Sequence, residues 1–405
     1  MAIDVSKLAS RAIELEKKSL QDITDITKGV ILDDSGRRIV LPSVIQGFRD
    51  SELDFSYPPI DGTKKFRDLT TEWILGDNLE AAKQSHEMLS FATIGGTGAI
   101  LMAFKFAQLY GYEVLLPDPG RPVYTDLANG ALAYTRRYPL LNRNDRFNIE
   151  AVANIIQEDK QRFKGFLLVV NDPGQDPVGH TLTEEESQQI IDQANACNRL
   201  GGTRLAILWD VAYMSYSDAR PTWLSRICQE RDSFSSFICF STGKSLACYG
   251  LRVGMILALL SKNSGELKTI LFNTFAKTAR QSYLIPDGVG MSAAVNVMSP
   301  QVLKNMRAEI APLRTLLHER SVRMRKALAD QNISYLPYDE GLFMTIAVNS
   351  NPELITKILK GKNIITTPMQ PRYLRFSLAS LPRGQEETIA LKIREAEIEA
   401  NSPGA

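Results

Sequence analysis

Short, continuously apolar runs alternate with helical patterns through the middle of the chain. Runs bounded by turn residues predict β-strands, and the stretches between them, such as TEEESQQIIDQANACNRLGG, predict amphipathic helices. The predicted strands between residues 113 and 260 are EVLLP, YTRRYPL, GFLLVV, RLAILWD, SFICFS and GMILALL. Because these runs are apolar throughout, we expect helices to cover both faces of the sheet. The pattern predicts an α/β layer fold.

From about residue 301 the pattern changes to a long charged helix, two short strands (LFMTIAV and YLRFSLASL) and a final helix. This change predicts a separate, smaller α+β domain. A chain of 405 residues also exceeds the usual size of one hydrophobic core. We therefore expect an N-terminal helix and arm that belong to the small domain (residues 1–48), a large domain (49–300) and a small C-terminal domain (301–405).

The N-terminal region combines a helical pattern with an arm. The first residues, MAIDVSKLASRAIELEKK, have apolar residues at helical spacing and lack the continuous apolar core of a signal peptide. In GVILDDSGRRIVLPSV the turn residues DDSG separate two apolar stretches, which predicts a hairpin or an irregular arm. The longest apolar run, residues 255–260, is too short to span a bilayer.

Composition narrows the possible classes of function. The formal net charge of +1, with 44% hydrophobic and 23% charged residues, gives no indication of binding to nucleic acid or to a membrane surface. The four cysteines form no CxxC pair and the three histidines are scattered, so we expect neither a metal site nor a disulfide scaffold. A reducing, cytoplasmic location fits these features.

Chemistry-bearing residues gather in the segment CFSTGKSLACYGLRVGMIL. Lys244 follows a predicted strand, with Ser241 three residues before it and Arg252 eight residues after it. An amine that forms a Schiff base, together with a hydroxyl and a guanidinium that hold a phosphate, is what a pyridoxal 5'-phosphate (PLP) site requires. Taken alone, the segment fits a strand followed by a solvated basic loop equally well.

Two further segments fit the same chemistry. Asp210 ends the predicted strand RLAILWD, at the sheet edge where α/β proteins bind ligands. A carboxylate there can pair with the pyridine nitrogen of PLP, and Tyr213 can contact the phenolic oxygen of the ring. By itself, Asp210 is as easily a helix N-cap.

The second segment, GGTGA at residues 95–99, offers unencumbered backbone N–H groups ahead of a helix N-terminus, which favours anions. It is neither a Walker A loop nor a GxGxxG dinucleotide turn. Without the other two segments, an ordinary glycine turn is the simpler interpretation.

The order and spacing of these segments resemble those of fold-type-I PLP-dependent enzymes, specifically the class I aspartate and aromatic-amino-acid aminotransferases. The resemblance runs from about residue 25 to residue 381 and includes YPPIDG, which is similar to that family's YxPIxG turn. It implies an α/β fold with a mainly parallel seven-stranded sheet between helices, a small α+β domain, a PLP cofactor and a cytoplasmic homodimer with shared active sites.

The resemblance also implies roles for individual residues. Lys244 would be the Schiff-base lysine and proton shuttle, Asp210 would pair with the pyridine nitrogen, and Tyr213 would contact the phenolic oxygen. The residues that would bind the phosphate are Gly95, Gly96, Thr97, Ser241 and Arg252, with Tyr57 reaching it from the partner subunit.

Two arginines would bind the substrate. Arg375, in YLRFSLASL, matches the arginine that forks onto the substrate α-carboxylate, and Arg280 matches one that grips a side-chain carboxylate from the neighbouring subunit. The planar guanidinium makes two parallel hydrogen bonds and so fixes the direction of the Cα–H bond. For each arginine the alternative is an ordinary structural or surface role.

Two positions depart from the family pattern. Asp176 stands where an asparagine usually donates a hydrogen bond to the phenolic oxygen of PLP, so Asp176 has to be protonated or turned away, with Asn171 as a possible substitute donor. Arg121 lies in the region of the family's stacking tryptophan, where it can stack, bind a second anion or simply be solvated.

The sequence therefore predicts a PLP-dependent aminotransferase of amino-acid metabolism. It would move an amino group between an L-amino acid (aspartate, glutamate or an aromatic one) and a 2-oxo acid. A PLP-dependent lyase or racemase on the same fold is one alternative, because the ring contacts at Asp176 and Arg121 are changed. A non-catalytic PLP-binding or regulatory protein is another.

Overall fold

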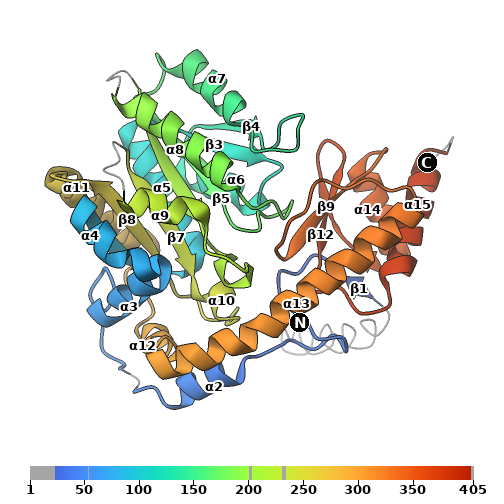
Figure 1. Cartoon of the computed structure of the whole chain (residues 1–405), viewed down its shortest axis with the longest axis horizontal. Helices are drawn as coiled ribbons and strands as arrows, with labels where there is room; N and C mark the ends of the chain where they lie inside the picture. Colours follow the sequence, from blue (N-terminus) through green and yellow to red (C-terminus); the bar gives the residue numbers. More distant parts are fainter. Residues whose placement is uncertain (1–22, 53, 200–202, 230–233, 403–405) are drawn as a thin grey trace, which may run out of the picture. The chain divides into compact units, whose positions relative to one another are not determined.

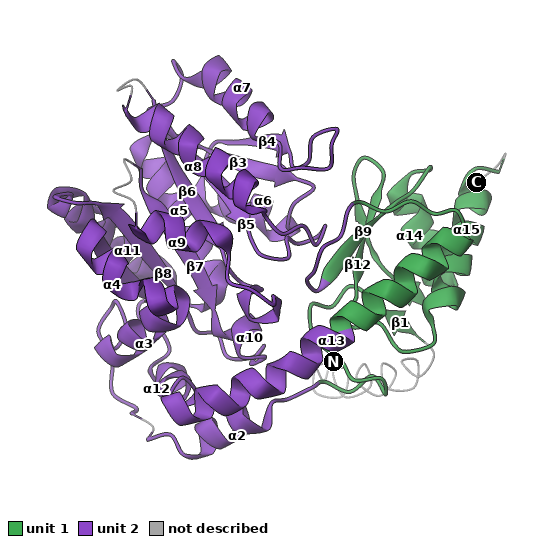
Figure 2. Ribbon diagram, in the orientation of Figure 1, with its two compact units in different colours: residues 1–38, 317–336, 343–405 green, residues 39–316, 337–342 purple. Residues whose placement is uncertain are grey.

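The computed structural model describes residues 23–52, 54–199, 203–229 and 234–402 (Figure 1). The helix predicted for the first residues lies outside this range. Contacts divide the chain into a smaller unit, residues 1–38, 317–336 and 343–405, and a larger unit, residues 39–316 and 337–342 (Figure 2). The predicted domain boundaries at residues 48 and 300 fall elsewhere, because helix α13 (Pro300–Asp330) is continuous and contributes to both units.

The larger unit is built on a seven-stranded sheet with the order β2-β8-β7-β6-β5-β3-β4. Only β8 runs antiparallel to its neighbours, which confirms the predicted mainly parallel sheet. Each apolar run predicted as a strand forms one. The strands are β2 (His86–Thr93), β3 (Tyr112–Asp118), β4 (Thr135–Pro139), β5 (Gly165–Asn171), β6 (Arg204–Asp210), β7 (Ser236–Ser241) and β8 (Gly254–Ser261).

Helices cover both faces of this sheet, as the apolar runs require. On one face lie α5 (Gly95–Tyr110), α6 (Pro122–Ala131) and α11 (Gly265–Ser282), packed on alternate strand residues such as Leu167 and Val169. On the other face lie α4 (Leu79–Ser85), α7 (Ile149–Asp159), α8 (Glu184–Arg199) and α9 (Thr222–Gln229) (Figure 1). The remaining helical segments of this unit are α2 (Pro42–Arg49), α3 (Lys64–Leu75), η1 (Gly76–Asn78), η2 (Met214–Tyr216), α10 (Thr242–Ser245) and α12 (Gly288–Val297).

The smaller unit contains the predicted pair of strands, β9 (Phe343–Ala347) and β12 (Tyr373–Ser377), in an antiparallel sheet with β11 (Thr367–Met369). A second pair, β1 (Thr24–Asp25) and β10 (Ile364–Ile365), is parallel. Helices α14 (Pro352–Gly361) and α15 (Glu386–Ala400) complete it with the C-terminal part of α13. Arg320, fully buried on α13, donates to the backbone carbonyls of Leu378, Ala379 and Leu32 and so ties these segments together.

The predicted arm is partly wrong. Leu32 and Arg38 form an antiparallel bridge around the DDSG turn, where Asp33 accepts from the backbone N–H of Ser35 and of Arg37, as a hairpin requires. The chain then enters α2 at Pro42, although we had included residues 42–44 in the arm. Proline at the first position of a helix is favoured because its missing N–H has no partner there in any case.

Among the described residues, no helix is long and apolar enough to cross a membrane, and no cluster of His, Cys, Asp and Glu is arranged to hold a metal ion.

A buried histidine in the larger unit makes stability depend on pH. His180 lies 3.1 Å from Glu186 and 3.1 Å from Asp339, one carboxylate at each ring nitrogen. Burial alone lowers its pKa, but the hydrogen bonds to Asp339 and Glu186 outweigh burial and raise the pKa to about 9. Because an unfolded histidine has a pKa near 6.5, the stabilisation is complete below about pH 6.5 and disappears as the pH rises through about 9.

We expect wild-type protein to lose up to about 3 kcal/mol of unfolding free energy across that range through this group. His180→Gln should be less stable at about pH 6 and equally stable at about pH 9.5. Urea unfolding of both proteins at the two pH values measures the difference. A variant whose stability falls as steeply with pH as that of the wild type would contradict this assignment.

Candidate active site

The carboxyl ends of three neighbouring strands create the site. In β5 and β6, Asn171 pairs in register with Asp210, and in β6 and β7, Asp210 pairs with Cys239, two residues before Ser241. Since parallel strands end at the same sheet edge, the segments that follow them converge there. These segments carry Asp176, Tyr213 and Lys244.

Lys244 lies on α10, the short helix that follows β7 directly. Its side chain is half-buried between two aromatic rings, with Nζ 5.9 Å from the centroid of Tyr213 and 5.3 Å from that of Tyr249. Tyr216 donates its hydroxyl proton to the backbone carbonyl of Lys244 at 2.8 Å. The turn after β6 therefore holds the backbone from which the lysine amine projects.

A cradle of phosphate size lies beside Lys244. Gly95 has φ +62°, and a Cβ there would lie 2.5 Å from Nη2 of Arg252. A Cβ at Gly96 would lie 3.0 Å from Cβ of Ser241. The hydroxyl and guanidinium thus approach backbone that only glycine leaves accessible, at the N-terminus of α5, whose first turn includes Thr97. Of the residues predicted to bind phosphate, all but Tyr57 are brought together here, in an arrangement that suits the phosphate of PLP.

Asp210 is almost fully buried, with 2% of its surface exposed. Its Oδ2 accepts hydrogen bonds from the Arg121 guanidinium and from the hydroxyl of Tyr124, the latter at 2.7 Å. Asp210 is not a helix N-cap; its Oδ1 accepts from the backbone N–H of Ala212 within the turn. A buried carboxylate with cationic partners can hold the ring nitrogen of the cofactor that the sequence predicts.

Tyr124 is a site residue that sequence reasoning missed. It lies on α6, three residues after Arg121, which caps that helix. Residues three apart share a helix face, so the position of Arg121 contained a usable signal. Burial and the Asp210 carboxylate raise the pKa of Tyr124 well above its usual value, which keeps the hydroxyl protonated as a donor.

Asp176 and Arg121, the two departures from the family pattern, contact each other. Nε of Arg121 lies 3.6 Å from Oδ2 of Asp176, and the same oxygen accepts the hydroxyl proton of Tyr213 at 2.8 Å. Arg121 is only 16% exposed, so it is not a solvated loop residue. Burial opposes its charge, but Asp210 and the neighbouring groups outweigh burial and raise its pKa above the usual value. Asp176 is therefore neither turned away nor left without a counter-charge.

Asn171 supports this arrangement from β5. Its amide nitrogen donates to the backbone carbonyl of Asp210 at 2.8 Å, and its amide oxygen accepts from the backbone N–H of Asp176 at 2.9 Å. One amide hydrogen and the oxygen are thus used to hold the two carboxylate-bearing segments together.

Because Arg121 contacts both Asp176 and Asp210, we expect the contributions of these charged groups to stability to be coupled. Asp176→Asn and Arg121→Gln should each lower the unfolding free energy of the cofactor-free protein, by about 1–3 and about 3–5 kcal/mol. The effect of Arg121→Gln is larger because it removes a cation that contacts both buried carboxylates. The double variant should lose at least about 1 kcal/mol less than the sum.

Urea unfolding of the four proteins measures this coupling. Arg137→Gln is the control, because Arg137 faces Asp118 at 3.7 Å on an exposed surface and should contribute about 0–1 kcal/mol. Additive effects of the two site substitutions would show that Arg121 does not compensate Asp176.

The remaining predicted residues belong to segments of the chain other than those that directly follow β5, β6 and β7. Tyr57, in an extended segment of the larger unit, is 88% exposed, and Arg280 is exposed in the last turn of α11. Arg375 belongs to the smaller unit, where its Nη1 donates to the carbonyl of Thr27 at 3.1 Å and its Cζ lies 3.6 Å from the ring centroid of Phe343. The roles of the two arginines toward the substrate and of Tyr57 toward the cofactor phosphate stay predictions.

Comparison with known proteins agrees with this geometry. The family model "Aminotransferase class I and II" matches residues 21–393. An aromatic-amino-acid aminotransferase of Paracoccus denitrificans is 23% identical over 347 residues, which cover 82% of this chain and 84% of that protein. The cytoplasmic isozyme 2 of aspartate aminotransferase from Arabidopsis thaliana is 22% identical over 291 residues, 69% of this chain and 68% of that protein.

A solved structure has the same fold. The aromatic-amino-acid aminotransferase from Burkholderia pseudomallei, covalently bound to pyridoxal phosphate, superposes with a TM-score of 0.75 at 18% identity and covers 98% of both chains. Since the family model spans most of the sequence and the described residues form a site that fits the cofactor, this chain belongs to the class I and II aminotransferases and is a PLP-dependent transferase of amino groups.

Proposed function

We propose that Lys244, Asp210 and Tyr213 form the catalytic centre of an aminotransferase that acts on an aromatic or dicarboxylic L-amino acid and a 2-oxo acid. The observation that carries this proposal is the convergence of Lys244, the buried carboxylate of Asp210 and the glycine cradle at one edge of the sheet. PLP supplies an electron-accepting ring when it is bound.

Each part of the cradle would hold a different part of the cofactor. Backbone N–H groups of Gly95, Gly96 and Thr97, with Ser241 and Arg252, would bind the phosphate at the N-terminus of α5. Asp210 would hold the ring nitrogen, with Tyr124 and Arg121 fixing the orientation of the carboxylate. These contacts leave Lys244 at the reacting end of the site.

Lys244 would move a proton from the substrate α-carbon. Its amine lies between Tyr213 and Tyr249, whose rings restrict water around it. A lysine that serves as a base has to be in its neutral form when it takes the proton. The hydrogen bond from Tyr216 to its backbone carbonyl positions the side chain for this transfer.

Arg121 would replace the donor that the family places at position 176. Tyr213 has one hydroxyl proton and donates it to Asp176. While that hydrogen bond exists, Tyr213 cannot donate the same proton to the phenolic oxygen of the cofactor, and the Asp176 carboxylate has no proton to donate. A guanidinium carries five N–H donors and keeps its charge, and Arg121 already spans Asp176 and Asp210. We infer that Arg121 presents the positive charge to that oxygen.

Three further residues would complete the site, two arginines for the substrate and Tyr57 for the cofactor phosphate. Arg375 would bind the α-carboxylate, while Arg280 and Tyr57 would reach across a homodimer interface, which fits their exposure in the larger unit. Aromatic and aspartate aminotransferases among the relatives support the two substrate classes. The four cysteines form no disulfide within the described part of the chain, which supports a reducing, cytoplasmic location. Membership of the aminotransferase family supports a role in amino-acid biosynthesis.

Separate half-reactions test the activity. The PLP-loaded protein should convert to the aminated cofactor with aspartate, glutamate or phenylalanine alone, and return with 2-oxoglutarate, as followed by absorbance. Accumulation of an elimination product or of the D-amino acid without an acceptor would instead identify a lyase or a racemase. No spectral change with any amino acid would contradict catalysis altogether.

A further inference from the structure

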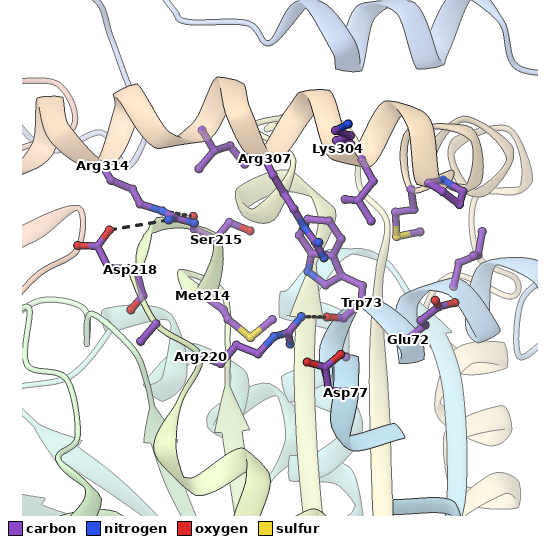
Figure 3. Close-up of a pocket in the computed structure, with 18 residues that line it drawn as sticks. Glu72, Trp73, Asp77, Met214, Ser215, Asp218, Arg220, Lys304, Arg307 and Arg314 are labelled. Atoms are coloured by element: carbon purple, nitrogen blue, oxygen red, sulfur yellow. Dashed lines mark hydrogen bonds and ion pairs between the residues drawn. The ribbon is translucent and has the colours of Figure 1, made fainter. Parts of the chain in front are cut away.

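A pocket outside the proposed catalytic centre lies within the larger unit (Figure 3). Its volume is about 820 Å³, and its walls come from α3 and η1, from the turn that follows Tyr213, and from the first half of α13. Of the residues proposed above for catalysis or cofactor binding, none lines it. The aminotransferase activity therefore leaves this pocket without an occupant.

Two guanidinium groups face each other in the pocket. Arg307 extends from α13 toward Trp73, with Cζ 5.8 Å from the ring centroid, and Arg220 lies on the opposite wall beside Met214 (Figure 3). Arg220 donates to the backbone carbonyls of Ile74 and Trp73, at 2.7 and 3.2 Å. Within the described part of the chain, neither guanidinium is ion-paired with a carboxylate.

The charges of this pocket do not cancel locally. Burial and the nearby charge of Arg307 lower the pKa of Arg220, and Asp77 offsets them only in part. A third arginine, Arg314, already faces Asp218 at 3.8 Å. Two like charges held together without a counter-ion favour an anion between them, because the anion removes their repulsion.

The rest of the lining is mixed: apolar side chains and two unsatisfied donors lie beside the carboxylates of Glu72, Asp77 and Asp218. Met214, Leu303 and Ile310 contribute aliphatic surface. The buried Nε1 of Trp73 and the buried hydroxyl of Ser215 have no hydrogen-bond partner among the described residues. A pocket with an apolar wall and two unpaired cations suits a molecule with both an acidic group and an apolar body.

We propose that this pocket binds a small organic anion, with its acidic group between Arg220 and Arg307 and its apolar part against α13. The site also has a route to the catalytic lysine. Met214 and Ser215 line the pocket, and in the same turn Tyr216 holds the backbone carbonyl of Lys244. Occupation of the pocket therefore regulates turnover without competing with the amino acid.

A fluorescent pair of probes tests the site on the PLP-loaded protein. 8-Anilino-1-naphthalenesulfonate carries the acidic group, and N-phenyl-1-naphthylamine is the same ring system without it. We expect one sulfonate probe per chain, bound at least about tenfold more tightly than the neutral probe. Arg307→Gln should remove that preference without changing the melting temperature, since Arg307 makes no hydrogen bond that the fold depends on.

Matched variants locate the probe. Lys65→Gln removes an exposed cation on α3 outside the pocket and should leave binding unchanged. Trp73→Phe should lower energy transfer from protein to probe, because Trp73 lines the pocket. Equal binding of the two probes, or equal effects of Arg307→Gln and Lys65→Gln, would overturn the proposal.

Kinetics test the regulatory part. Saturating sulfonate probe should change kcat in the wild type and leave kcat unchanged in Arg307→Gln. An increase in KM alone, shared by both proteins, would place the probe in the substrate site and overturn the proposal. The titrations need no turnover, so their outcome is independent of whether the proposed substrates are correct.

Discussion

Lys244→Ala is expected to lose about 10⁴-fold or more in kcat while keeping its fold. The substitution removes the amine that attaches the cofactor and also the base that moves the α-proton. Lys244 lies on the short helix α10 and is half-buried, so truncation leaves no large cavity. The reaction is therefore affected far more than stability.

Three measurements separate these contributions. Borohydride reduction followed by peptide mass spectrometry should show cofactor covalently bound to Lys244 in the wild type and to no lysine in the variant. Thermal unfolding should be unchanged, and Lys65→Ala, on an exposed face of α3, should keep full activity. A Lys244→Ala protein that retains more than about one hundredth of wild-type turnover would remove this residue from the catalytic centre.

Asp210→Asn should lower kcat by about 10²–10³-fold. An amide has no charge to keep the ring nitrogen protonated, so the ring withdraws electrons from the substrate less strongly. The same change leaves Arg121 facing Asp176 alone, so we also expect a loss of about 2–4 kcal/mol in the stability of the cofactor-free protein.

Tyr124→Phe is the matched control for Asp210. It removes one hydrogen bond at 2.7 Å to the carboxylate but keeps the charge, so turnover should fall by about tenfold or less. Steady-state kinetics and the absorbance of the bound cofactor against pH distinguish the two variants. If Asp210→Asn and Tyr124→Phe are equally active, the charge of Asp210 does not act on the ring.

The larger unit shows how far sequence reasoning reaches. Most of its strands are apolar on both faces, and this property is local, so these predicted runs form strands. The edge strand β4, which is mostly exposed, also forms where it was predicted. The short strands β10 and β11 of the smaller unit were not predicted, because two or three residues carry no periodicity. Helix α14 was also missed, although its ten residues are amphipathic. The end of the arm was wrong because Pro42 was taken as part of the extended segment although it begins a helix.

The residues of the candidate site likewise fall into those that the sequence could identify and those that it could not. Lys244, Asp210 and Ser241 could be identified because each stands at or just after the end of a recognisable strand, and parallel strands deliver such positions to one edge. Tyr124 was missed although it lies three residues after Arg121 on the same helix. The pocket between Arg220 and Arg307 could not be identified, since it depends on which helix faces lie opposite one another.

The sequence by itself therefore determined the layer architecture, the cofactor and the residues at the strand ends, because continuous apolar runs and short spacings express themselves locally. Only the tertiary structure decided what Asp176 and Arg121 do. Lying 55 positions apart in the chain, each looked like a separate departure from the family pattern. Folding places them 3.6 Å apart beside Asp210, where the low polarity of a buried site makes each charge depend on the others.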